Sequence, residues 1–429
     1  MTSRDQGELI LGFARVLYVN GQSTERTITA VKELASTLGL SAVVMPRWGE
    51  LRLEVTDKSG SLAWQVAANP AGVNMQRVAA AMQAMEDVKA GRIGPLDFAS
   101  AIRQIAKAPS APTWLFTLAA SAGAAALAVI FGVAHLAAVG LIVLSAAIGA
   151  VTRRVLASRS TNLFIQPLCA ALLAGVVGSL AVRYNLSSSL RLVAVCPCMV
   201  LVPGPHLLNG ALDLVGGRIH LGAARLLYAL LIILAIVVGL LLGLGLLGVP
   251  LPVDPAGHAV PLWMDVIAAG IAVFAYSVFF SMPLKMLPWP VAVGMVAHAA
   301  RWAAITLFGA GVATGALIAC VFVSVVLTPV ARRWHMPFAA IGFASVVSMM
   351  PGVYLFRMSS GLLQIAGGSA TTVDLLGATA ADAITAFMII LAMGVGLVVP
   401  EMLIDRRDRR QKSPGLSGPA PHAELAQRP

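Results

Sequence analysis

One short phrase occurs twice in the apolar part of this chain, and it limits the folds that the chain can adopt. Val202-Pro203-Gly204-Pro205 is matched by Met350-Pro351-Gly352-Val353, with the two Pro-Gly pairs 148 residues apart. A Gly-Gly pair follows each phrase, at Gly216-Gly217 and Gly367-Gly368. Proline removes a backbone donor and glycine relaxes the backbone, so each Pro-Gly pair predicts an interrupted helix. Interruptions at corresponding places in two apolar halves are typical of membrane transporters built from repeats.

Composition predicts that most of the chain lies in a membrane. Hydrophobic residues make up 58% of the chain and charged residues only 11%, which excludes an ordinary soluble protein. Residues 1–112 hold 12 Lys/Arg and 10 Asp/Glu, whereas the longer stretch 113–404 holds 12 and 6. The first stretch is therefore expected in water. No nucleic-acid partner is expected, because no basic face with interleaved aromatic residues occurs outside the membrane flanks.

Residues 1–112 are expected to form a small cytoplasmic α+β domain. Its expected elements are a helix over 9–17, a helix over 23–38, strands at Leu51–Thr56 and Ser61–Val66, and helices at Met75–Lys89 and Pro95–Ala106. The stretch contains no histidine, so it offers no Ser-His-Asp set, and it lacks a Walker loop. We expect no catalytic residues, no metal site and no cofactor in the chain.

The apolar part predicts ten membrane spans of about 20 residues each. The expected spans are 114–133, 136–152, 163–182, 191–210, 223–247, 262–281, 289–307, 310–329, 338–356 and 382–403. Clusters of Lys and Arg alternate with poorly charged loops, and they lie on one side if both termini are cytoplasmic. The chain is then a multi-pass protein of the plasma membrane.

Each copy of the repeated phrase belongs to a set of five spans, which is an odd number. The second set must therefore enter the membrane in the opposite orientation, which predicts two inverted repeats, at 113–260 and 261–404. Residues 405–429 are basic and are expected to form a disordered cytoplasmic tail. Homo-oligomerisation is left open by the sequence.

Polar residues follow the first Pro-Gly pair at helical spacing. His206, Asn209 and Asp213 would share one face if the helix resumes after Gly204. His206 and Asp213 are candidates for proton binding, because ionisable groups inside a membrane are costly. The alternatives are an interior histidine with satisfied hydrogen bonds and a solvated aspartate at the helix end.

The second half offers a different set of polar residues. Ser348 and Tyr354 flank its Pro-Gly pair, and Arg357 follows near a predicted membrane boundary, where it can extend to water. Asp382 is the third proton-binding candidate, because Ala381 and Ala383 suit close helix packing around it. Asp265 and Glu401 lie near span ends, where water is close, and are weaker candidates.

The motifs together resemble the threonine/serine exporter family. The resemblance lies in Val202-Pro203-Gly204 followed by Asn209, Asp213 and Gly222, and in the N-terminal segments Leu11–Arg15, Asn20–Arg26 and Trp48–Leu51. It covers about residues 9–404 and implies a cytoplasmic N-terminal domain with ten membrane helices. It further implies export of L-threonine and L-serine across a bacterial plasma membrane, driven by the proton motive force. Arg218 follows Gly216-Gly217 where the family often has an acidic residue, which leaves the substrate open.

The residues and the resemblance lead to one hypothesis about the site. The half-helix ends at Pro203, Gly204, Pro351 and Gly352 are expected to face each other near the midplane. Exposed N–H groups there would bind the substrate carboxylate, and unpaired carbonyls its ammonium group. Asn209, Ser348 and Tyr354 would complete the substrate site, and Asp213, His206 or Asp382 would bind the exchanged proton. A channel or facilitator, or a lipid-modifying enzyme embedded in the membrane, are the alternatives.

Overall fold

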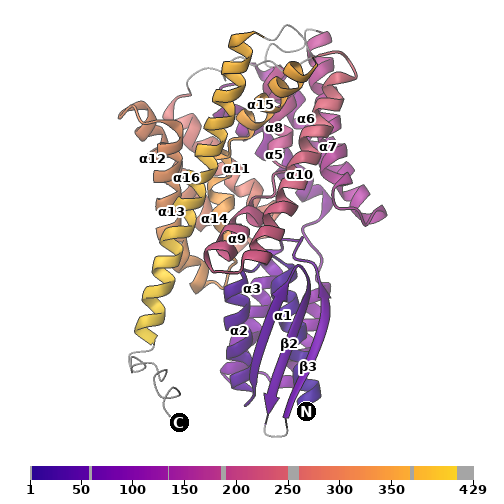
Figure 1. Cartoon of the computed structure of the whole chain (residues 1–429), viewed down its shortest axis with the longest axis vertical. Coiled ribbons are helices and arrows are strands. Elements are labelled where there is room, and N and C mark those ends of the chain that lie inside the picture. Colours follow the sequence, from indigo (N-terminus) through magenta and orange to yellow (C-terminus); the bar gives the residue numbers. More distant parts are fainter. Residues whose placement is uncertain are drawn as a thin grey trace, which may run out of the picture.

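The computed structural model describes residues 2–57, 60–133, 135–184, 190–249, 260–367 and 372–412. These residues form a small N-terminal unit of helices and one sheet, and a larger helical bundle above it (Figure 1). The elements of the N-terminal unit are α1 (Ser3–Val19), α2 (Thr24–Thr37), β1 (Ser41–Arg47), β2 (Gly49–Asp57), β3 (Gly60–Ala68), α3 (Met75–Lys89) and α4 (Pro95–Lys107).

The three strands of the N-terminal unit form an antiparallel sheet in the order β1-β2-β3. Leu51, Leu53 and Val55 of β2 are buried against the helices, which places one face of the sheet on the core. The Ser23 side chain accepts a hydrogen bond from the backbone N–H of Arg26 and so begins α2. The four helices and two of the strands confirm the sequence predictions for this region.

Strand β1 was missed by the sequence predictions. Val43 and Met45 point outward from it, with 50% and 37% of their surface exposed, so its two faces do not alternate between apolar and polar. Pro46 also lies within the strand, and a proline inside such a run is evidence against a strand. Strand β1 forms an edge of the sheet, where a missing N–H can be tolerated.

The bundle consists of helices α5 to α16. Their bounds are α5 (Thr113–Ile130), α6 (Leu136–Arg159), α7 (Ile165–Arg183), α8 (Leu190–Met199), α9 (Gly204–Val215), α10 (Ile219–Gly245), α11 (Leu262–Phe279), α12 (Pro288–Thr306), α13 (Val312–Arg333), α14 (Phe338–Val346), α15 (Gly352–Ala366) and α16 (Val373–Lys412), with short 3-10 turns η1 (Leu284–Met286) and η2 (Val347–Met349).

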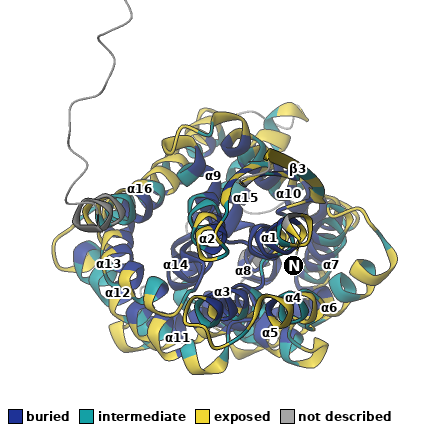
Figure 2. Ribbon diagram, turned by 90° about the horizontal axis from the view of Figure 1, so that it is seen from below, coloured by how far each residue is buried: buried dark blue, intermediate teal, exposed yellow. Residues whose placement is uncertain are grey.

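Seven of the described helices are long and apolar enough to cross a membrane, and nine spans result if each bent helix pair counts as one. Helix α12 covers the predicted span 289–307 but does not belong to that set, so the count of ten spans stays a prediction. Large apolar side chains such as Leu230, Phe274 and Phe387 are exposed on the outside of the bundle. Figure 2 shows this exposed rim around a buried interior, as expected for helices that face lipid. The protein is thus a polytopic helical membrane protein.

Both predicted interruptions are present. Helices α8 and α9 are bent by 54° at their junction, and the α14–η2 segment and α15 are bent by 64°. Pro203 and Pro351 immediately precede α9 and α15 as their N-cap residues. The Pro-Gly pairs therefore end one half-helix and begin the next, as the sequence predicted.

Corresponding helices in the two halves of the bundle pack against corresponding neighbours. Helix α7 packs on α10 as α13 packs on α16, and α9 packs on α10 as α15 packs on α16. The halves meet through α5 and α11. In Figure 1, α9 lies at the end of the bundle beside the N-terminal unit, whereas α15 lies at the opposite end.

Candidate functional site

Each helix break packs against the broken span of the other half. A Cβ added to Gly204 would overlap the ring of Phe343 in α14, so only glycine fits beside that ring. A Cβ added to Gly352 would lie 2.9 Å from Cγ of Met199, the last residue of α8. The two Pro-Gly pairs therefore lie close to the crossing of α8 and α14.

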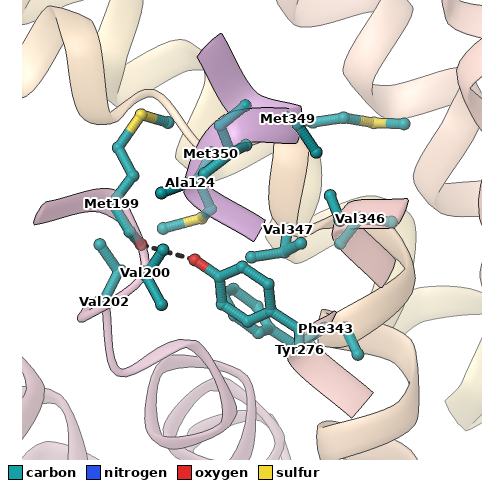
Figure 3. Close-up of a cluster of buried hydrophobic side chains, with 14 of the residues drawn as sticks. Ala124, Met199, Val200, Val202, Tyr276, Phe343, Val346, Val347, Met349 and Met350 are labelled. Carbon is teal, nitrogen blue, oxygen red and sulfur yellow. Dashed lines mark hydrogen bonds between the residues drawn. The ribbon is translucent and has the colours of Figure 1, made fainter. Parts of the chain in front are cut away.

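The crossing is filled by apolar side chains. Met199, Val202, Val347 and Met350 are all buried there (Figure 3). The Tyr276 hydroxyl from α11 donates a hydrogen bond of 2.7 Å to the Met199 carbonyl oxygen, which also accepts the Val202 N–H at 3.4 Å. The centre of the bundle is thus closed by apolar packing around the two breaks.

The N-terminal amides of the two second half-helices differ. In α9 the Gly204 N–H donates to Val202 O, Pro205 has no N–H, and the His206 N–H donates to Pro203 O. In α15 the N–H groups of Gly352, Val353 and Tyr354 have no acceptor among the described residues. The expected anion-binding amides are therefore available at the second break and are occupied at the first.

A chain of buried polar groups leads to the second break. His298 of α12 lies with Nδ1 3.0 Å from Asp265 Oδ2 and with Nε2 2.5 Å from Ser348 Oγ in η2. All three side chains are almost completely buried. Since a neutral imidazole donates through one nitrogen and accepts through the other, this chain can carry a proton between Asp265 and Ser348.

The first break is followed by an ion pair on the side of the N-terminal unit. Asp213 Oδ2 in α9 lies 3.0 Å from Nε of Arg225 in α10, and both side chains are buried. The hydroxyl of Thr24, at the start of α2, also donates to Asp213 Oδ2 at 3.0 Å. Arg218 pairs with Glu25, which adds a second link between this end of the bundle and α2.

The other predicted residues of α9 also contact the N-terminal unit. The Asn209 side-chain amide donates to Gly21 O at 3.2 Å. His206 packs edge-on against Tyr228 and contacts the backbone of Ala71. The Tyr18 ring covers the Arg225 guanidinium at 5.3 Å, and burial raises the pKa of Tyr18 to about 12, so its hydroxyl keeps its proton. This face of α9 is therefore a buried interface.

The second half carries an ion pair of its own at the far end. Arg357 Nε in α15 lies 3.0 Å from Asp382 Oδ2 in α16, and both side chains are largely buried. Here the arginine lies on the half-helix and the aspartate on the long helix, whereas Asp213 and Arg225 have the reverse arrangement. Each second half-helix is thus tied to the helix that follows it.

The predicted site residues fall into three groups rather than one. Ser348, Pro351, Gly352 and Tyr354 lie together at the second break. His206, Asn209 and Asp213 lie on α9 at the interface with the N-terminal unit, and Asp382 lies at the opposite end of the bundle. The apolar crossing separates the first two groups.

The sequence predictions missed the partners that give these residues their setting. Asp265 was judged too close to a span end, yet it is 4% exposed. His298, Arg225 and Thr24 were not considered as site residues. The signal for His298 was available, because it is a histidine within an apolar segment, but its partners lie 33 and 50 residues away along the chain.

Seven spanning helices, two bent helix pairs and buried charges at both breaks define a membrane transporter-like protein. Comparison with known families then identifies it more closely. Residues 8–247 match the family described as "Putative threonine/serine exporter", and residues 265–403 match "Threonine/Serine exporter, ThrE". The chain belongs to the threonine/serine exporter family, a family of transporters. Neither curated proteins nor solved structures gave a match.

Proposed function

We propose that this protein exports small polar amino acids, L-threonine and L-serine, in exchange for protons. The observation that carries the proposal is the second break, where three amides that bond no described residue adjoin the buried Ser348–His298–Asp265 chain. Free amides at a helix N-terminus attract a carboxylate, and a histidine chain responds to protons. One site of this kind can bind both an amino acid and the driving ion.

The substrate is placed at the breaks. The amides of Gly352, Val353 and Tyr354 bind its carboxylate, and Ser348 is in position to bind a side-chain hydroxyl. At the first break, the carbonyls of Val200 and Leu201 accept no hydrogen bond from a described residue, and such carbonyls attract an ammonium group. Asn209 links α9 to the N-terminal unit, because its side-chain amide donates to the Gly21 carbonyl oxygen.

Proton coupling is assigned to the buried acids and to His298. Protonation of Asp213 would break its ion pair with Arg225, and protonation of Asp382 would release Arg357. Each event would free a second half-helix from the long helix beside it, so the two pairs act as gates at opposite ends. His206 supports the first gate through its contacts with Tyr228 and Ala71.

The proposed orientation has two inverted five-span repeats and both chain ends in the cytoplasm of a bacterium. Helices α9 and α15 lie at opposite ends of the bundle, which is what inverted repeats require. The last turns of α16 point to the same end as the N-terminal unit (Figure 1). Arg332 and Arg333, at the end of α13, and Arg159, at the end of α6, fit the positive-inside bias at that end.

The test is transport by purified protein reconstituted in liposomes. With the cytoplasmic face outward, an imposed proton gradient should drive accumulation of labelled L-threonine, and unlabelled L-serine should compete. Flux that only equilibrates, with or without a gradient, would indicate a facilitator and contradict proton coupling. Absence of any threonine flux would contradict the proposed substrate.

A further inference from the structure

Arg153, in α6, is a buried cation to which the described part of the chain offers no anionic partner. Its Nε and Nη1 atoms are inaccessible to solvent and form no hydrogen bond. The titratable groups that act electrostatically on it are Arg154, Tyr276 and Tyr228, none of which is a carboxylate. A buried charge without a partner is costly, so its retention needs an explanation.

Aromatic rings hold this guanidinium by its faces. The Arg153 Cζ atom lies 4.9 Å from the ring centre of Phe279 and 5.8 Å from that of Phe116. Stacking of this kind positions the planar group and leaves its N–H edges free. Those edges are the part of arginine that binds a carboxylate through two parallel hydrogen bonds.

A second unsatisfied polar group lines the same cavity. Ser145 is 1% exposed and its hydroxyl has no hydrogen-bond partner, although a helical serine usually bonds the carbonyl four residues earlier. Ser145 and Arg153 lie two turns apart on α6, about 12 Å along the axis, and the arginine side chain leans back toward the serine. Both line one cavity with Pro197, Val200 and Leu201 of the first break.

The first break supplies acceptors to this cavity. The carbonyl oxygens of Val200 and Leu201 accept no hydrogen bond from any described residue, because Pro205 has no N–H and the Gly204 N–H bonds Val202. The cavity thus combines a cation, two free carbonyls and a hydroxyl. The remaining lining includes small residues such as Ala146, Gly149 and Ala170, which leave space beside them.

We propose that this cavity is the substrate site on the side of the N-terminal unit. Arg153 binds the carboxylate of a small amino acid, the Val200 and Leu201 carbonyls bind its ammonium group, and Ser145 binds a side-chain hydroxyl. This inference rests on the proposed function, and it names a station separate from the free amides of α15. The cavity measures about 10 Å³, room for about one water molecule, so it is closed here and must widen when α8 moves.

The location of the cavity fits loading from the cytoplasm. The N–H groups of Met75 and Gln76 in α3 donate to the carbonyls of Phe280 and Ser281, immediately after Phe279. The neighbouring Arg154 donates to Ala111 O, in the link between the N-terminal unit and α5. Substrate that arrives at this end of the bundle therefore meets Arg153 before the apolar crossing.

Arg153→Gln tests the inference, with Arg154→Gln as the matched control. Both variants lose one positive charge from the same turn of α6, but Arg154 bonds a backbone carbonyl and does not line the cavity. We expect Arg153→Gln to raise the KM for labelled L-threonine by about tenfold or more, the effect of losing a charge-assisted pair. Wild-type protein should be inhibited far better by L-serine than by L-threoninamide, which lacks the carboxylate. Arg153→Gln should lose this preference, and Arg154→Gln should keep it.

Ser145→Ala gives a second reading that does not depend on the charge. It should leave the KM for L-alanine unchanged and weaken the preference for L-serine over L-alanine by about fivefold, the value of one hydrogen bond. The inference would be overturned if Arg153→Gln left both the KM for L-threonine and the preference for L-serine over L-threoninamide unchanged. It would also be overturned if Ser145→Ala left the preference for L-serine over L-alanine unchanged. If the wild-type protein does not transport L-threonine, both the proposed function and this inference are overturned.

Discussion

The two broken spans share a Pro-Gly pair and a bend, yet their second half-helices lie in different surroundings. Helix α9 is covered by the N-terminal unit, which contacts it through Thr24 and Gly21. Helix α15 is tied within the bundle by the Arg357–Asp382 pair, and no described residue accepts a hydrogen bond from its first three amides. The two corresponding breaks therefore differ. The N-terminal unit holds the first, and the second offers backbone N–H groups that bond no described residue.

The difference also separates two kinds of ligand chemistry. The first break offers free carbonyls and the unpaired Arg153, whereas the second offers free amides and the His298 chain. The proposed export of a zwitterion requires binding sites on both sides of a closed centre. Changes made in matched pairs, one in each half, can therefore test whether the halves differ as described.

The largest expected effect comes from filling the two break glycines. Gly204→Ala should abolish transport and lower stability by about 1–3 kcal/mol or more, because its Cβ overlaps the Phe343 ring. Gly352→Ala should cost less, because the flexible Met199 side chain can move away. Thermal unfolding of purified protein and threonine flux measure both. Phe343→Leu added to Gly204→Ala should restore part of the stability; no recovery would show that the ring is not the obstacle.

Whereas the break glycines should have the largest effect on transport, the two ion pairs should have the largest effect on stability. Asp213→Asn leaves Arg225, which is 0% exposed, without a counter-charge, and should lower stability by about 3–5 kcal/mol. Asp382→Asn should lower it less, because Arg357 retains 11% side-chain exposure and can reach water. Thermal unfolding in detergent compares the variants directly. Equal losses in the two variants would contradict the asymmetry between the gates.

His298 belongs to the second half alone, since Ala150 lies at the corresponding place in the first. His298→Gln should abolish most of the accumulation driven by a proton gradient while exchange of labelled for unlabelled threonine continues. Glutamine keeps a hydrogen bond to Ser348 but cannot be protonated near neutral pH. The exposed His220 provides the control, because His220→Gln should behave as wild type. Gradient-driven accumulation by His298→Gln would remove the histidine from the coupling step.

The smallest expected effect tests the cover over α9. Thr24→Val removes one hydrogen bond to Asp213 and should lower stability by about 1 kcal/mol. It should also increase hydrogen exchange at the amides of α9 more than at those of α15. Equal changes in the two half-helices would show that the N-terminal unit does not hold α9.

The sequence predicted the parts of the fold that depend on local pattern. The Pro-Gly pairs, the apolar helices and four helices of the N-terminal unit follow from short-range spacing and were recovered. Strand β1 was not, because Val43 and Met45 conceal its alternation. For the proposed site, the sequence named Ser348 and Asp213 but not the residues that they contact, His298 and Arg225. These contacts depend on how the helices pack against one another, and the spacing of residues within one helix does not predict that packing.

The central claim, that the half-helices α9 and α15 end on opposite sides of the membrane, can be tested by labelling single cysteines in cells. The reporters are Val215→Cys and Ala366→Cys, the last residues of α9 and α15, in a variant whose native Cys169, Cys196, Cys198 and Cys320 are replaced. A thiol reagent that cannot cross the membrane should label position 366 from outside intact cells and position 215 only after the cells are opened. Labelling of both positions from the same side would contradict the inverted arrangement and the transport mechanism built on it.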